Sequence, residues 1–330
     1  MMKRVIYPAA TAGALLGLIL LTPISTTWVA GMLEKRYPPP GQMVPVGNYK
    51  LQLYCSGSGS PTVVIEPGMG VDWVGWRGVI ASLLPSNRVC VYDRAGYGWS
   101  DPGPKPRTAL LETRELHTML TRAGVPQPYI LAAHSFGAYI ARIYASQFRD
   151  SLAGVVLVDP SSEEEPIVDM TKIMGRGWRM RDLLDLIPPL GIQRLRRMYN
   201  GENALPRDLR SAPRFYQERY LIASSLAQLK YERNEFDSLS LTRAQVRATV
   251  FPRDLPLIVI TAVRPADVHA SSGPTGQELQ ARLAHLSASG RQIFARRSGH
   301  MIPVDEPELI VGAVQELTRQ SSRRTEAALP

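Results

Sequence analysis

Short apolar segments separated by helical stretches place the strongest constraint on the fold of this chain. Several of them are apolar on both faces, which is typical of strands in a parallel sheet that is covered on both sides. Helical periodicity fills most of the intervals between them. The pattern therefore predicts an α/β fold with a mostly parallel sheet and helices on both faces. The segments are Val63–Glu66, Val89–Tyr92, Tyr129–Ala133, Gly154–Val158, Leu257–Thr261 and Gln292–Ala295.

One long stretch interrupts this alternation. Residues 161–253 show helical and loop patterns without a convincing strand, and they are rich in Arg, Leu and Met. Because the stretch lies between two predicted strands, we interpret it as a helical cap inserted into the core. The core then comprises residues 41–160 and 254–320, and the polar residues 321–330 are expected to form a disordered tail.

Residues 1–40 are predicted to form a membrane anchor and a linker. Lys3 and Arg4 precede an apolar run, Val5–Leu33, which is long enough to span a bilayer, since a span takes about 20 apolar residues. The positive flank predicts a cytoplasmic N-terminus and a body outside the cytoplasm. The alternative is a signal peptide cleaved near Ala30, which would leave a secreted or periplasmic protein. We favour the uncleaved anchor.

Composition argues against several classes of function. The net charge is +9, but the basic residues are dispersed rather than clustered with aromatic ones, so we predict no nucleic-acid partner. Solvated surface or attraction to anionic lipid accounts for the charge. Two cysteines without a CxxC motif or a Cys/His cluster predict no zinc site. Phosphate-binding and dinucleotide fingerprints are missing from the sequence, so we expect no cofactor.

A serine between an apolar segment and a helical one is the strongest catalytic candidate. The sequence around Ser135 reads Ala133-His134-Ser135-Phe136-Gly137, which is a G-x-S-x-G motif with alanine in the first glycine position. Small flanking residues allow the tight turn that exposes such a serine. The helix that follows favours negative charge beside the hydroxyl. The alternative is a serine that only caps this helix.

Together with this motif, three other segments resemble the α/β-hydrolase superfamily, and the resemblance extends over Val44–Thr318. Glu66–Gly70 is similar to the family's oxyanion loop, with Pro67 in the place of histidine. Asp93–Ser100 is similar to its D-x-R-G-x-G-x-S turn, and Ser298–His300 resembles its late catalytic-histidine loop. The resemblance implies a mostly parallel eight-stranded sheet, a helical cap inserted after the sixth strand, and a serine nucleophile.

The resemblance also implies the catalytic residues. Ser135 is expected to be the nucleophile, and His300, which follows the last predicted strand, the base. The family usually supplies the acid after the strand Leu257–Thr261, where Asp267 arrives about two residues late. Some relatives take it from the end of the preceding strand, where Asp159 stands. We place the acid at Asp159 and keep Asp267 as the alternative.

Two backbone N–H groups are expected to bind the oxyanion of the reaction. They are the N–H of Phe136, which follows the nucleophile, and the N–H of Met69 in the oxyanion loop. Glu66 stands next to this loop and could be mistaken for a catalytic carboxylate. We interpret it as structural.

These assignments predict acyl transfer from an ester-like substrate to water. The Leu, Met and Trp178 content of the cap indicates a small-molecule substrate with an apolar acyl or alcohol group. The alternatives are an acyltransferase that uses the same triad with another acceptor, and a non-catalytic protein that uses the site to bind a ligand. Turnover of short nitrophenyl esters distinguishes the enzyme from the binding protein.

The resemblance further predicts one disulfide. Cys55 and Cys90 lie in predicted strands that are neighbours in the resembled fold. Adjacent strands are about 5 Å apart, a separation that a disulfide tolerates. Two buried free thiols are the alternative.

Removal of residues 1–40 is expected to move the protein from the membrane fraction to the soluble fraction, because these residues carry the predicted anchor. Fractionation of cells that express the full-length and shortened chains, followed by immunoblotting, measures the change. A soluble full-length product whose mature N-terminus lies near Ala30 would support the cleaved signal peptide instead.

Overall fold

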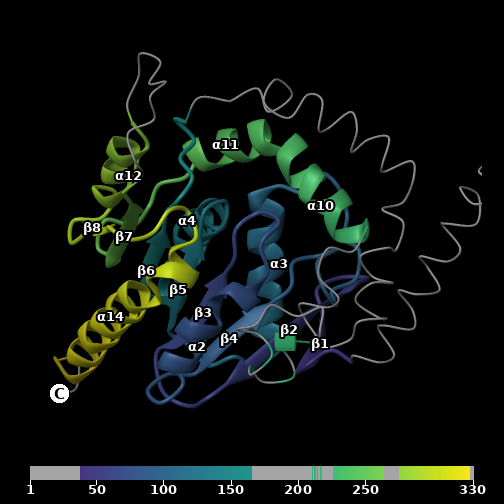
Figure 1. Ribbon diagram of the computed structural model, residues 1–330, viewed down its shortest axis with the longest axis horizontal. Coiled ribbons are helices and arrows are strands. Elements are labelled where there is room, and N and C mark those ends of the chain that lie inside the picture. The colour runs from purple at the N-terminus through teal and green to yellow at the C-terminus, as the bar shows by residue number, and fades with distance from the viewer. Residues whose placement is uncertain are drawn as a thin grey trace, which may run out of the picture. The chain divides into compact units, whose positions relative to one another are not determined.

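The computed structural model describes residues 38–165, 226–263 and 275–327, with the isolated residues 210, 212, 214, 216 and 217. The strands are β1 (Gln42–Pro45), β2 (Lys50–Ser56), β3 (Thr62–Glu66), β4 (Val89–Tyr92), β5 (Tyr129–His134), β6 (Leu152–Val158), β7 (Leu257–Ala262) and β8 (Arg291–Ala295). They form an eight-stranded sheet in the order β1-β2-β4-β3-β5-β6-β7-β8 (Figure 1). The β1–β2 and β2–β4 pairs are antiparallel and the other pairs are parallel, which confirms the predicted sheet.

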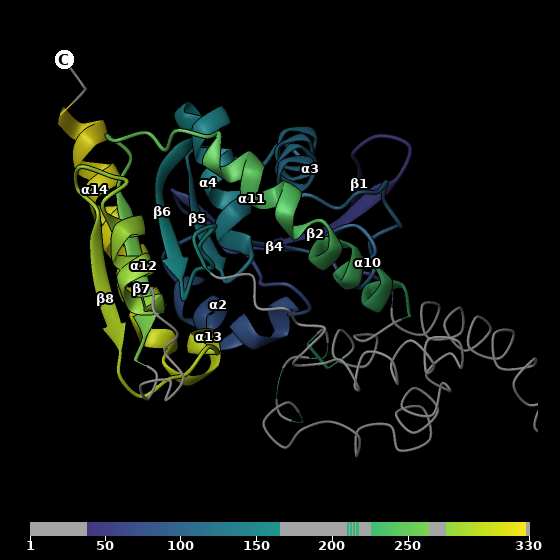
Figure 2. The same ribbon diagram turned by 90° about the horizontal axis from the view of Figure 1, so that it is seen from above.

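Helices cover both faces of this sheet. On one face α4 packs against α3 and contacts β3, β5 and β6, and on the other α14 contacts β5, β6, β7 and α2 (Figure 2). β3, β5 and β7 are buried along their whole length between these layers, as their apolar sequences predict. The helices are α2 (Arg77–Leu83), α3 (Ala109–Arg122), α4 (Gly137–Gln147), α10 (Leu226–Asp237), α11 (Leu239–Arg247), α12 (Gly276–Ala284), α13 (Ile302–Asp305) and α14 (Pro307–Ala327), with short 3₁₀ turns at Trp73–Trp76 and Arg149–Ser151.

The described part of the insertion between β6 and β7 contains α10 and α11. α11 packs on α3 and α4 (Figure 2). At the start of α3, the N–H of Ala109 donates to the Thr242 hydroxyl (3.2 Å), and the N–H of Leu110 donates to the Gln245 side-chain oxygen (3.3 Å). These bonds satisfy two N–H groups that the first turn of a helix cannot pair itself.

The chain divides into two compact units, residues 1–38 with 166–226 and residues 39–165 with 227–330. α11 and nearly all of α10 therefore belong to the same unit as the sheet, although the sequence pattern assigned them to the cap. The boundaries of the cap, residues 161–253, stay a prediction.

The C-terminal end corrects one expectation. α14 continues to Ala327, so residues 321–327 are helical rather than disordered. Arg, Glu and Ala residues in these turns are good helix formers, and just before them the Gln320 amide donates to the Glu316 carboxylate one turn earlier (3.3 Å). The positive charge of Arg324 in the last turn also interacts favourably with the negative end of the helix dipole.

Among the described helices, none combines the length and the apolar content that crossing a bilayer requires. The predicted anchor in residues 1–37 and Trp178 of the cap lie outside the described residues. Membrane attachment therefore stays a prediction.

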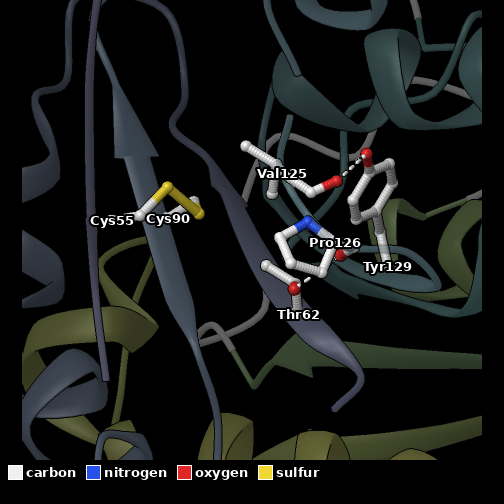
Figure 3. Close-up of a disulfide and its surroundings, with 6 residues drawn as sticks. All are labelled: Cys55, Thr62, Cys90, Val125, Pro126 and Tyr129. Atoms are coloured by element: carbon white, nitrogen blue, oxygen red, sulfur yellow. Dashed lines mark hydrogen bonds between the residues drawn. A yellow bond between two sulfur atoms is a disulfide. The ribbon is translucent and has the colours of Figure 1, made fainter. Parts of the chain in front are cut away.

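A disulfide joins Cys55 and Cys90, which face each other across the antiparallel β2–β4 pair (Figure 3). Their Cα atoms are 4.1 Å apart. The pairing expected from the resemblance is therefore present. Nearby, the Tyr129 hydroxyl donates to the carbonyl of Val125 (2.9 Å) and fixes the loop that leads into β5 (Figure 3).

Glu163 fastens the start of the insertion to the core. Its carboxylate accepts two hydrogen bonds from Arg142 of α4 (2.5 and 2.7 Å), and its carbonyl accepts one from Arg247 of α11 (2.6 Å). Burial raises the pKa of Glu163, but the hydrogen bonds and charge of Arg142 outweigh burial, so this pKa is lowered overall.

Reduction of the disulfide is expected to lower the free energy of unfolding by about 3–4 kcal/mol, because the bond closes a loop of 35 residues and so restricts the unfolded chain. Urea unfolding with and without reductant measures this difference. A variant in which both cysteines are alanine is the control, since its midpoint should not respond to reductant. Two free thiols in protein denatured without reductant would contradict the bond.

Glu163→Gln is expected to destabilise the protein at pH 7 and to lose this effect as the pH falls. A carboxylate whose folded-state pKa is lowered stabilises above its unfolded pKa, about 4.3, and this contribution disappears as the pH falls through the folded-state value. Urea midpoints at pH 7 and about pH 3.5 measure the change. Glu164→Gln is the matched control, because it removes only an exposed ion pair with Arg282. An equal cost of Glu163→Gln at both pH values would contradict the assignment.

Candidate active site

Ser135 lies at the turn between β5 and α4. Its backbone φ of 54° falls in the left-handed region that residues other than glycine seldom adopt. The turn is held by β6 and the residues after it, because the Ser135 N–H donates to the carbonyl of Val158 (3.1 Å) and the Ser135 carbonyl accepts from the N–H of Ser161 (3.2 Å). Backbone strain that the surroundings maintain in this way is concentrated at functional sites.

Close packing explains the small residues on either side of Ser135. A Cβ on Gly137 would lie 2.7 Å from the carbonyl oxygen of Glu66, so a side chain cannot fit there. Ala133 is buried in β5 between Glu66 of β3 and Leu157 of β6, where its methyl group is accommodated. The motif therefore tolerates alanine at its first glycine position but requires glycine at its second.

Asp159 and His300 meet at the carboxyl edge of the sheet. Asp159 follows β6, and its Oδ2 lies 2.6 Å from Nδ1 of His300. The Asp159 side chain is 1% exposed, whereas the His300 side chain is 43% exposed. A carboxylate beside Nδ1 keeps the proton on that nitrogen, which makes Nε2 the nitrogen that can accept a proton.

Several backbone and side-chain groups fix the position of Asp159. Its N–H donates to the carbonyl of Ile260 (2.7 Å), and its Oδ1 accepts from the N–H of Ala262 (3.3 Å) and from the amide of Gln280 (3.0 Å). Gln280, in α12, also donates to the carbonyl of Pro160 (3.1 Å). Sequence reasoning missed Gln280, because a polar residue in a helix carries no signal of the strand end that it reaches.

Neighbouring residues also hold the loop that carries His300. The Glu306 carboxylate accepts from the backbone N–H of Arg297 (2.7 Å). Nε2 of His134 lies 2.8 Å from the carbonyl oxygen of His300, and because a carbonyl can only accept, this Nε2 carries the proton. His134 thus contributes to the position of His300 through the backbone.

The predicted base lies close to the predicted nucleophile in the fold. The ring centroids of His134 and His300 are 4.5 Å apart, and Ser135 follows His134 directly. Asp267, the alternative acid, lies outside the described residues. The structure therefore brings Ser135, His300 and Asp159 to one end of the sheet, and the choice between the two acids stays a prediction.

The loop from Glu66 to Gly70 borders the turn at Ser135. A Cβ on Gly68 would lie 3.1 Å from Cβ of Ser135. Within the described part of the chain, the N–H groups of Met69 and Phe136 form no hydrogen bond with another backbone group. Two such groups beside a serine are the arrangement that stabilises an oxyanion.

A buried cluster of charged groups adjoins this loop. The Arg94 guanidinium lies 2.8 Å from Glu66 and 2.9 Å from Glu235 of α10. The Tyr92 hydroxyl donates to the other oxygen of Glu66. Burial raises the pKa of Glu66 to about 7, although the charge of Arg94 and the hydrogen bond from Tyr92 act in the opposite direction. Glu66 thus holds two side chains of the core, in keeping with the structural role expected for it.

Within residues 38–165, 226–263 and 275–327, no group of three or more His, Cys, Asp or Glu side chains is placed to hold a metal ion. The serine, histidine and carboxylate at the sheet edge are the groups that nucleophilic catalysis uses.

Comparison with known proteins identifies the family of this chain. A sequence model of the alpha/beta hydrolase fold matches residues 61–230. The chain is 27% identical over 282 residues to an AB hydrolase superfamily protein of Gibberella zeae, an alignment that covers 78% of this chain and 86% of that protein. The alignments with three other curated relatives cover only 42–46% of those proteins' own length.

Two solved structures share the fold. An esterase from Thermogutta terrifontis is 20% identical with a TM-score of 0.56, over 85% of this chain and 98% of that one. An enol-lactonase from Burkholderia xenovorans is 17% identical with a TM-score of 0.57, over 84% and 99%. At these identities the likeness concerns the fold alone.

Proposed function

Since the chain belongs to the α/β-hydrolase fold family, we propose that it is a serine hydrolase that cleaves an ester-like acyl substrate. One observation carries the proposal. The 2.6 Å contact between His300 Nδ1 and Asp159 Oδ2 lies at the same sheet edge as the strained turn of Ser135. A nucleophile, a base and a group that orients the base are the three parts that covalent acyl transfer needs.

In the proposed reaction, Ser135 Oγ forms a bond to the substrate carbonyl carbon while its proton passes to Nε2 of His300. Asp159 keeps the imidazole oriented through Nδ1 and stabilises the positive charge that the ring gains. The proton then passes from His300 to the leaving alcohol as the carbon–oxygen bond to that alcohol breaks. Water, deprotonated by His300, then attacks the acyl carbon. As the bond from that carbon to Ser135 Oγ breaks, the proton passes from His300 to Oγ and the acid product leaves.

The carbonyl oxygen becomes negative in both tetrahedral intermediates. The N–H groups of Met69 and Phe136 would donate to it, and the N-terminus of α4 adds a favourable dipole. Because these donors belong to the backbone, the oxyanion site depends on the backbone conformation at Met69 and Phe136 more than on the identity of their side chains.

The proposed substrate class draws on the structural neighbours and on the composition of the insertion. Structures of the same fold include an esterase and an enol-lactonase. The apolar residues of the insertion favour an apolar acyl or alcohol group. Attachment to a membrane through residues 1–40, with the catalytic part outside the cytoplasm, completes the proposal and rests on the N-terminal sequence.

Ser135→Ala is expected to lower the turnover of nitrophenyl esters by at least about a thousandfold while the protein keeps its melting temperature, because the nucleophile is lost without a change in the core. Initial rates with esters of graded acyl length, with thermal unfolding as the control, measure this. Residual turnover within about tenfold of wild type would contradict the assignment. Wild-type protein that reacts with a fluorophosphonate but turns over no ester would favour the binding protein or an acyltransferase.

Asp159→Asn is expected to reduce ester turnover on the order of 10³- to 10⁴-fold, because an amide beside Nδ1 no longer stabilises the protonated ring. Asp267→Asn is the matched control, and we expect it to cost less than about tenfold. Thermal unfolding verifies that both variants are folded. A larger loss for Asp267→Asn would move the acid to the usual family position.

A further inference from the structure

The guanidinium of Arg94 uses all five of its N–H groups in the interior of the protein. The residue is 4% exposed. Nη1 donates to the carbonyl of Pro67 (2.7 Å) and to Glu66 (2.8 Å), and Nη2 donates to the carbonyl of Gly68 (3.0 Å). Nε and Nη2 donate to the two oxygens of Glu235 (2.9 and 3.3 Å). Lysine cannot reproduce this planar set of contacts.

One of these contacts, from Arg94 to the carbonyl of Gly68, fixes the peptide that carries a predicted oxyanion donor. The carbonyl of Gly68 and the N–H of Met69 belong to one planar trans peptide, in which the C=O and N–H bonds point in opposite directions. A donor that holds the Gly68 oxygen therefore also sets the direction of the Met69 N–H. The N–H of Val71 donates weakly to the same oxygen (3.3 Å), so Arg94 supplies the shorter bond.

Helix α10 holds the guanidinium in place. Glu235 is completely buried, and besides Arg94 it accepts from the Tyr97 hydroxyl (2.9 Å). The Tyr97 oxygen in turn accepts from the N–H of Gly70, at the end of the loop (3.2 Å). A short chain of hydrogen bonds thus links a helix between β6 and β7 to both ends of the segment 67–70.

We propose that Arg94 is a positioning residue for the oxyanion loop and that Glu235 of α10 holds it in that role. Arg94 does not reach the substrate and acts through the peptide between Gly68 and Met69. Glu235 supplies the countercharge without which the buried guanidinium would turn away from the loop. The inference rests on the proposed hydrolase function, because it assigns a task that exists only if an oxyanion forms.

The test compares binding of a transition-state analogue with binding of the substrate. A trifluoromethyl ketone adds Ser135 Oγ to its carbonyl carbon, transfers the proton to His300 and leaves a negative oxygen in the oxyanion site. Arg94→Lys is expected to lower kcat by about ten- to a hundredfold and to raise the ketone Ki by a similar factor, with KM changed by less than about threefold. A purely structural role predicts no such split.

Arg107→Lys is the matched control. Arg107 is also completely buried and forms two 2.6 Å hydrogen bonds with Glu115, and the hydrogen bonds and ion pairs described for its side chain are with Glu112 and Glu115 rather than with the oxyanion loop. Its replacement is expected to lower the melting temperature while kcat and the ketone Ki stay within about threefold of wild type. The control therefore separates the loss of a buried charge pair from the loss of loop geometry.

Glu235→Gln tests the contribution of α10 and replaces Arg94→Lys if that variant fails to fold. We expect a smaller loss in the same direction, and a double variant that is no worse than Arg94→Lys alone, since both changes act on one contact. The inference is overturned if Arg94→Lys, or Glu235→Gln in its place, behaves as Arg107→Lys does while wild type is active. Wild-type protein that neither hydrolyses esters nor binds the ketone overturns the proposed function, and the inference with it.

Discussion

The left-handed turn at Ser135 is the constraint on which the candidate site depends. A positive φ at the end of β5 brings the start of α4 so close to β3 that a Cβ on Gly137 would lie 2.7 Å from the carbonyl oxygen of Glu66. On the other side, the N–H of Ser135 donates to the carbonyl of Val158 in β6. The end of β3 leads into the oxyanion loop and the end of β6 leads into Asp159, so one backbone turn determines where both segments lie.

The charges beside this turn are not balanced in pairs. Two guanidinium groups face four carboxyl groups, and burial together with the charge of Glu235 raises the pKa of Glu112 well above its usual range. Uncompensated carboxylates in the interior cost several kcal/mol each, so burial favours the protonated form of Glu112. The arginines are therefore required in the core, and the oxyanion loop is attached to one of them. The groups are Arg94, Arg107, Glu66, Glu112, Glu115 and Glu235.

Sequence patterns predicted the features that local chemistry determines. Burial on both faces leaves a direct trace in the composition of β3, β5 and β7, and a tight turn restricts the residues around Ser135. The roles of Gln280 and Glu235 could not be predicted, because Gln280 is 121 residues from Asp159 in the sequence and Glu235 is 141 residues from Arg94. A polar residue in a helix also leaves the same sequence pattern whether it faces water or a buried ion. The helical conformation of residues 321–327 was missed because polar composition does not separate an exposed helix from a disordered tail.

The bonds from α3 to Thr242 and Gln245 bear on how proteins of this fold can diverge. A helix of the core has its first turn completed by acceptors that belong to a segment inserted elsewhere in the chain. A recombination that exchanged this segment for one from a relative would have to supply acceptors at the same two places, or leave the N–H of Ala109 and Leu110 buried and unpaired. By these contacts α11 is part of the scaffold rather than an exchangeable module.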